Sequence, residues 1–140
     1  MKKFIFVLLL LSLFIFNSCK DDCYTAPEIV SLKIQNANNV NLVEDGTLSS
    51  NFTIQEVVGG GNFIGINHTV TSDFKLNLDK NVGRFNGTKK YQFISTVKTF
   101  EFTVKSSNSN DGCDGFKIDD IQFQNVSASK ENGFYKIIFD

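Results

Sequence analysis

The chain has 140 residues and a formal net charge of −1, with 14 Lys and Arg against 15 Asp and Glu. This balance argues against a nucleic-acid partner, which calls for Lys and Arg clustered on one face. The length suits one domain with a modest core. The chain has 15 Phe and 3 Tyr but no Trp, so it lacks the residue that most commonly stacks on sugars.

The chain begins with the pattern of a signal peptide. Lys2 and Lys3 give a positive start, and the 13 residues 4–16 are apolar apart from Ser12. A membrane-spanning helix needs roughly 20 apolar residues, so this run is short for a span and typical of a signal peptide.

The next stretch, Phe16-Asn17-Ser18-Cys19, places a small residue before a cysteine. It resembles the lipobox of bacterial lipoproteins, although Phe16 stands where Leu is usual; looser boxes occur in Bacteroidota. The resemblance implies that residues 1–18 are cleaved and that Cys19 carries a diacylglyceryl group, often with a further acyl chain. Two or three acyl chains make membrane anchoring stable. A plain signal peptide and an uncleaved anchor are the alternatives.

Lys20-Asp21-Asp22 directly follows the lipobox. It resembles the surface-export signal of Bacteroidota lipoproteins, which implies an outer-membrane lipid anchor and exposure at the cell surface. A solvated charged tether is the alternative. We therefore expect a signal peptide at 1–18, a lipidated tether at 19–28 and a single β domain at 29–140.

Two cysteines remain if Cys19 is acylated. Cys23 and Cys113 are an even pair in an oxidising compartment, which predicts a disulfide. Two free thiols or a metal pair are the alternatives, but two distant cysteines with one His do not make a zinc site.

From residue 29 onward the sequence predicts successive strands and no amphipathic helix. Apolar and polar residues alternate with a period of two, as in half-buried strands. The residues expected to face inward are Val30, Leu32 and Ile34; Phe52 and Ile54; Ile64, Ile66 and Val70; Phe74, Leu76 and Leu78; Tyr91, Phe93 and Val97; Phe100, Phe102 and Val104; Phe116, Ile118, Ile121 and Phe123; and Tyr135, Ile137 and Phe139. The pattern slips at Asp119-Asp120, which predicts an irregular strand there.

Turn signals separate these segments. Dipeptides that tolerate positive φ in tight hairpin turns recur at Asp45-Gly46, Asn86-Gly87, Asp111-Gly112, Asp114-Gly115 and Asn132-Gly133. About eight short strands with such turns predict an all-β fold, a small antiparallel β-sandwich, with a small β-barrel as the alternative.

One central stretch resembles a known lipoprotein family. Residues 74–87 include an alternating strand and Gly83-Arg84-Phe85-Asn86-Gly87, with Tyr91 nearby. This is similar to the middle of META-domain (HslJ-like) lipoproteins, although the Gly-Cys-Asn hallmark of that family is missing. The resemblance implies a META-like β domain as another alternative fold.

The candidate chemical sites are sparse. His68 is the only histidine, and we expect a structural or surface role for it. The acidic loop at 108–120 offers a weak calcium candidate in Asp111, Asp114, Asp119 and Asp120, but it fails the EF-hand spacing. Gly59-Gly60-Gly61 is expected to form a hairpin tip, and the Lys89-Lys90 doublet to lie at a solvated hairpin end.

These features predict a non-catalytic binding or interaction module on a lipid tether, with no catalytic residues, cofactor or metal. The alternative is an inhibitor or immunity-type lipoprotein that acts on a partner enzyme. The expected partners are the membrane and a protein or glycan ligand. An exposed apolar patch favours a protein partner, whereas a concave groove with convergent polar groups favours a glycan or small ligand.

Overall fold

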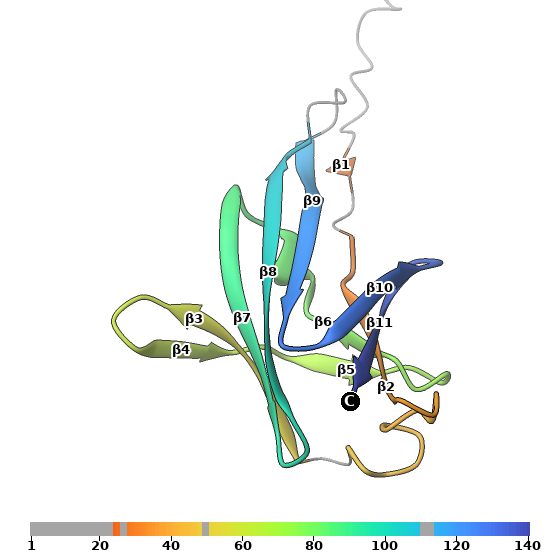
Figure 1. Ribbon diagram of the computed structural model, residues 1–140. Helices are drawn as coiled ribbons and strands as arrows, with labels where there is room; N and C mark the ends of the chain where they lie inside the picture. Colours follow the sequence, from red (N-terminus) through yellow and green to blue (C-terminus); the bar gives the residue numbers. More distant parts are fainter. Residues whose placement is uncertain (1–23, 26–27, 49–50, 110–113) are drawn as a thin grey trace, which may run out of the picture.

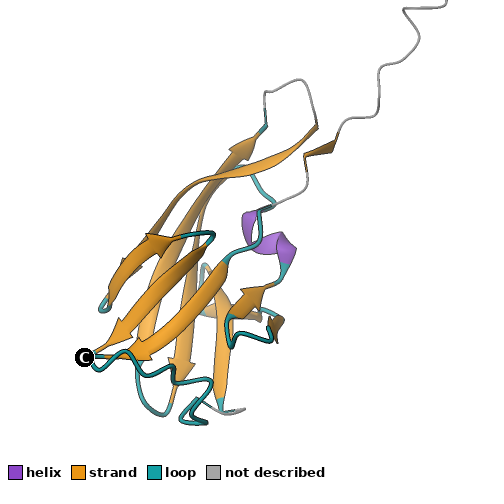
Figure 2. Cartoon of the chain, turned by 90° about the vertical axis from the view of Figure 1, so that its right-hand side faces the viewer, coloured by secondary structure: helices purple, strands orange, loops and turns teal. Residues whose placement is uncertain are grey.

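The computed structural model describes residues 24–25, 28–48, 51–109 and 114–140 (Figure 1). These residues form eleven strands and one short 3₁₀ helix, η1 (Lys80–Gly83). Apart from η1, the described chain consists of strands and loops (Figure 2).

The strands form two sheets. The first has the order β1-β9-β8-β7-β3-β4, and the second has the order β10-β11-β2-β6-β5. The strands of the first sheet are β1 (Tyr24–Thr25), β9 (Asp114–Gln124), β8 (Thr99–Asn108), β7 (Gly87–Ser95), β3 (Phe52–Val58) and β4 (Asn62–Gly65). Those of the second are β10 (Ser127–Glu131), β11 (Phe134–Phe139), β2 (Ser31–Asn36), β6 (Leu76–Leu78) and β5 (His68–Val70).

The two sheets pack face to face and are not closed into a barrel, which confirms the expected small β-sandwich. Most ladders are antiparallel, but β11 pairs with β2 and β1 pairs with β9 in parallel. A parallel pair needs a long connection between its strands, and most of the chain separates the members of each pair. The β1–β9 ladder also extends the described contacts of the domain to Tyr24, which precedes the expected boundary at residue 29.

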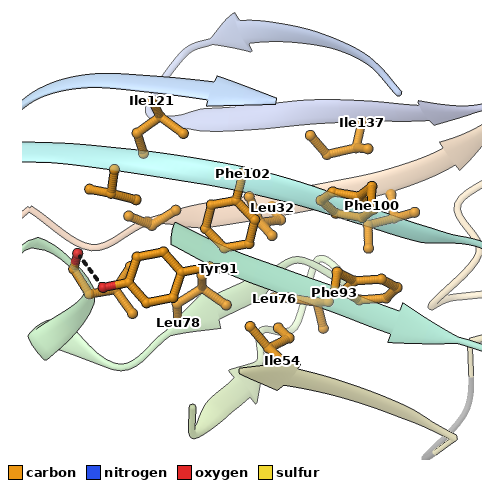
Figure 3. Packing of buried hydrophobic residues seen from close by; sticks show 14 of the residues in the cluster. Leu32, Ile54, Leu76, Leu78, Tyr91, Phe93, Phe100, Phe102, Ile121 and Ile137 are labelled. Atoms are coloured by element: carbon orange, nitrogen blue, oxygen red, sulfur yellow. Dashed lines mark hydrogen bonds between the residues drawn. The ribbon is translucent and has the colours of Figure 1, made fainter. Parts of the chain in front are cut away.

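The core lies between the sheets and is rich in aromatic rings (Figure 3). Leu76, Phe93 and Phe102 are each 0% exposed, which confirms that they are buried. Phe93 stacks on Phe100 with ring centroids 4.9 Å apart, and Tyr91 stacks on Phe102 at 5.2 Å. These pairs join the adjacent strands β7 and β8, where directly opposite side chains share a face.

Tyr91 is the one tyrosine among the four fully buried aromatic residues of the described chain, the others being Phe93, Phe100 and Phe102. Its hydroxyl donates to the Val82 carbonyl of η1 at 3.4 Å (Figure 3). Burial, and then the Glu56 carboxylate, raises the pKa of Tyr91 above its usual value. The hydroxyl therefore stays protonated at neutral pH and holds η1 against the end of the core.

The irregularity expected at Asp119-Asp120 is present, and it is a β-bulge. Lys105 pairs with Asp120, whereas the next residue, Ser106, pairs with Ile118. Asp119 is therefore the extra residue of β9. A bulge of this kind breaks the alternation because two residues of one strand face a single residue of the other.

The prediction that Ile64, Ile66 and Val70 share a face was wrong. Ile64 lies on β4 and Val70 on β5, which belong to different sheets, and their side chains are 55% and 51% exposed. Only Ile66, in the connection between them, packs against the core. The chain crosses from one sheet to the other here, and the alternation within a single strand carries no sign of such a crossing. At the ends of two other segments, Phe74 and Val97 are also exposed, at 38% and 49%.

The Lys89-Lys90 doublet does not lie at a hairpin end. Both residues are in the middle of β7, where Lys89 forms an ion pair with Glu56 at 2.9 Å and Lys90 with Glu101 at 2.7 Å. Glu101 lies on β8, the next strand of the same hairpin, whereas Glu56 lies on β3, 33 residues before Lys89. Only strand pairing could reveal these contacts.

The turn signals were partly correct. Asn132-Gly133 joins β10 to β11, and Gly133 has the positive φ of 79° that a tight hairpin requires. Asn86-Gly87 instead leads from η1 into β7, and Gly115 lies within β9. Asp45-Gly46 lies in the loop after β2, and Asp111-Gly112 lies outside the described residues.

Candidate functional site

A groove of about 270 Å³ opens at the corner between β9 and β10. β1 pairs only with the first two residues of β9, Asp114 and Gly115. The later part of β9 therefore borders this corner as an edge, and β10 is the last strand of the opposite sheet. Two sheet edges that belong to different layers thus flank one concave site.

The floor of the groove is apolar and continuous with the core. It is formed by Ile118, Ile121 and Phe123 of β9 and by Tyr135 of β11. The rings of Phe123 and Tyr135 are 5.4 Å apart, and Phe123 also stacks on buried Phe102 at 5.7 Å. Packing on both sheets therefore fixes the position of the floor.

Two carboxylates, Asp119 and Asp120, line the groove because of the bulge. Asp119 Oδ1 accepts a hydrogen bond from Ser107 Oγ at 3.0 Å, and Asp120 Oδ2 accepts one from Gln122 Nε2 at 2.8 Å. A carboxylate can accept about four hydrogen bonds. Both side chains are thus oriented by a neighbour and keep capacity for a ligand.

The opposite rim comes from β10 and carries a cation. Ala128, Ser129 and Lys130 line this side. Lys130 Nζ lies 5.5 Å from the centre of the Tyr135 ring and 3.6 Å from Glu28 Oε1. Tyr135 first, and then Glu28, raises the pKa of Lys130 above its usual value, so its ammonium group is charged at neutral pH.

The acidic calcium candidates are only partly covered by the structure. Asp119 and Asp120 line the groove, Asp114 begins β9, and Asp111 lies outside the described residues. Within the described part of the chain, no three His, Cys, Asp or Glu side chains come together as a metal site. Six further predicted site residues also lie outside the described part of the chain: Cys19, Lys20, Asp21, Asp22, Cys23 and Cys113.

His68 lies on β5, away from the groove. Its ring is 4.7 Å from that of Phe52, and its Nδ1 is buried with no hydrogen-bond partner. This packing between the two sheets agrees with a structural role. Gly59-Gly60-Gly61 joins β3 to β4, as the sequence predicts for a hairpin tip.

The sequence did not single out Ser129, Lys130 or Tyr135 as site residues. Ser129 and Lys130 lie on β10, which follows β9 after only two residues, and Tyr135 lies on the next strand, β11. They face the β9 side of the groove because the chain passes here from one sheet into the other. The one available signal was the slip of the alternation at Asp119-Asp120, which marks the bulge. Bulges are enriched next to functional sites, so this slip does indicate the position of the groove.

Searches of protein-family models, curated proteins and solved structures found no match for this chain. The resemblance to META-domain lipoproteins therefore stays a hypothesis. Among the described residues, no helix is long and apolar enough to cross a membrane.

Proposed function

We propose that this chain is a lipoprotein of the outer membrane, displayed at the cell surface, whose β-sandwich binds a glycan without turnover. The observation that carries the proposal is the groove between β9 and β10, which combines an aromatic floor with a polar rim. Anchoring rests on the lipobox at Cys19, and display rests on Lys20-Asp21-Asp22.

The chemistry of the groove fits a sugar ring. Sugars offer apolar C–H faces together with many hydroxyl groups, so they need an apolar surface next to acceptors and donors. Tyr135 and Phe123 supply the first, and the Asp119 and Asp120 carboxylates supply acceptors. The chain has no Trp, so Tyr135 takes the place of the commonest sugar-stacking residue.

The size of the groove indicates a small unit. Its volume of about 270 Å³ lies just below the roughly 300 Å³ at which typical ligand pockets begin. It therefore suits a single ring or chain end of a longer glycan. A small concave site favours binding of a glycan or small ligand. The alternative function, inhibition of a partner enzyme, would instead call for an exposed apolar patch that contacts a protein.

The binding test uses the full-length lipoprotein in detergent on an array of neutral and acidic oligosaccharides. We expect binding by the wild type and at least a tenfold loss in Asp120→Asn, because hydrogen bonds to charged groups contribute about 1.5–3 kcal/mol. Glu44→Gln is the matched control, because it removes the same charge from an exposed site outside the groove. No binding to any glycan, or an equal loss in the control, contradicts the proposal.

Display is tested separately by treating intact cells with protease. The wild-type domain should be degraded, whereas the Asp21→Ala/Asp22→Ala variant should be protected until the cells are opened. Protection of the wild type in intact cells contradicts surface display and leaves glycan binding and anchoring untouched.

A further inference from the structure

Strand β4 is an open edge with exposed apolar side chains. It is the last strand of the first sheet and pairs only with β3, with which it forms a hairpin that projects from the body of the sandwich (Figure 1). All four of its residues are exposed, including Phe63 at 52% and Ile64 at 55%. An edge of this kind presents unpaired backbone groups that another strand can use.

The usual protection of an edge strand is missing from β4. Natural edges are commonly guarded by charges, Pro or a bulge. The 16 residues 57–72 contain no Asp, Glu, Lys, Arg or Pro, and β4 pairs with β3 without a register shift. By contrast, the β10 edge carries Lys130 and Glu131. The β10 edge is thus guarded, whereas β4 and the three-residue β5, which ends the second sheet within the same uncharged stretch, are not. β4 is the longer of the two unguarded strands and carries the larger exposed apolar side chains.

We propose that β4 pairs antiparallel with β4 of a second copy of this chain, giving a two-fold symmetric dimer with a sheet that runs through both copies. The charge pattern favours this occupant. Two copies of a charged edge repel each other, whereas two copies of this uncharged edge meet without any electrostatic cost. A charged partner peptide finds no complementary charge on β4. The dimer does not depend on the glycan-binding proposal.

The symmetry decides which side chains meet. In an antiparallel pair around a two-fold axis, one residue of the strand lies opposite its own copy. With Phe63 on the axis, its ring lies opposite its own copy on one face of the sheet. Ile64 points to the other face, where it lies opposite Asn62 of the second copy. With only four residues in β4, the contact belongs to the small class of interfaces, and we expect a weak dimer.

The test is cross-linking of the full-length chain in its own membranes. Ile64→Cys places a thiol on the edge, and Val97→Cys is the matched control, with a similar exposure of 49% in the turn between β7 and β8. A short thiol-to-thiol cross-linker should give a band of doubled mass for Ile64→Cys and not for Val97→Cys. The chain without an added cysteine measures any background from native thiols.

A second substitution tests the pairing itself. Adding Phe63→Lys to Ile64→Cys should reduce the doubled band at least tenfold, because two ammonium groups are brought together across the axis. Phe63→Glu should act alike, and circular dichroism checks that both variants fold. The proposal is overturned by no doubled band, by an equal band for Val97→Cys, by persistence in both charged variants, or by a product of another mass that shows a foreign partner.

Discussion

Tyr24 pairs with Asp114 in the short parallel ladder between β1 and β9. Each of these residues directly follows a cysteine in the sequence, Cys23 and Cys113. Both cysteines lie outside the described residues. The pairing of their neighbours nevertheless bears on the predicted disulfide, because paired strands lie about 4.8 Å apart and disulfides join Cα atoms about 4.4–6.8 Å apart.

We therefore expect Cys23 and Cys113 to be joined in protein taken from the cell envelope. The bridge closes a loop of about 90 residues and in the chain-entropy model stabilises the fold by roughly 4.5 kcal/mol. Peptide mapping by mass spectrometry without reductant should find the linked pair, and reductant should lower the melting temperature. Recovery of both thiols free from oxidised envelope contradicts the prediction.

Cys19 should carry the lipid, and residues 1–18 should be absent from the mature protein. Metabolic labelling with an alkyne fatty acid should tag the wild type and the control variant Cys113→Ala, but not Cys19→Ala. The Cys19→Ala protein should also leave the membrane fraction, because it lacks the acyl chains that hold the chain there. Equal labelling of all three proteins is the result that contradicts acylation at this residue.

Truncation of the buried residues should destabilise the sandwich strongly. Leu76→Ala, Phe93→Ala and Phe102→Ala each remove a side chain that is 0% exposed. Each should lower the free energy of unfolding by about 2–5 kcal/mol, since contacts are lost and a cavity remains. Val97→Ala, at an exposed site, should change it by no more than about 0.5 kcal/mol. Urea unfolding measures all four, and an unchanged midpoint for any buried site refutes its packing.

Gly83→Ala should destabilise the contact between η1 and β9. A Cβ at residue 83 would lie 2.8 Å from both Cδ1 and Cγ1 of Ile118, which is too close. We expect a loss of about 1–3 kcal/mol from this overpacking. Ile118→Val removes one of the clashing atoms, so the double variant should lose less than the sum of the two single variants. Additive losses in urea unfolding speak against the clash.

Asp73 should titrate well below an ordinary aspartate. Hydrogen bonds from Lys75 and then Thr71 lower its pKa from 3.8 to about 2. Because the folded-state pKa lies below the unfolded value, this group's contribution to stability is present above about pH 4 and is lost as the pH falls towards 2. Nuclear magnetic resonance titration should give the low pKa in the wild type and a value closer to 3.8 in Lys75→Met. A wild-type pKa near 3.8 contradicts the contact.

The predictable part of the fold came from short-range patterns. Val30, Leu32 and Ile34 alternate with polar residues, and Phe100, Phe102 and Val104 do the same; their burial followed directly from that period. The bulge was also visible, because Asp119 interrupts the alternation within a single strand. Such signals need only neighbours along the chain, so a sequence can carry them without knowledge of the partner strands.

The sequence by itself determined the all-β class, the inward faces of most strands and the expected lipidation site at Cys19. Only the tertiary structure decided that β2 pairs in parallel with β11, that Lys89 meets Glu56, and that Asp120 and Tyr135 line one groove. It also left Phe63 on an open edge. The physical reason is that strand order and sheet edges depend on which distant segments pair, whereas a side-chain period of two says only which face of a strand is apolar.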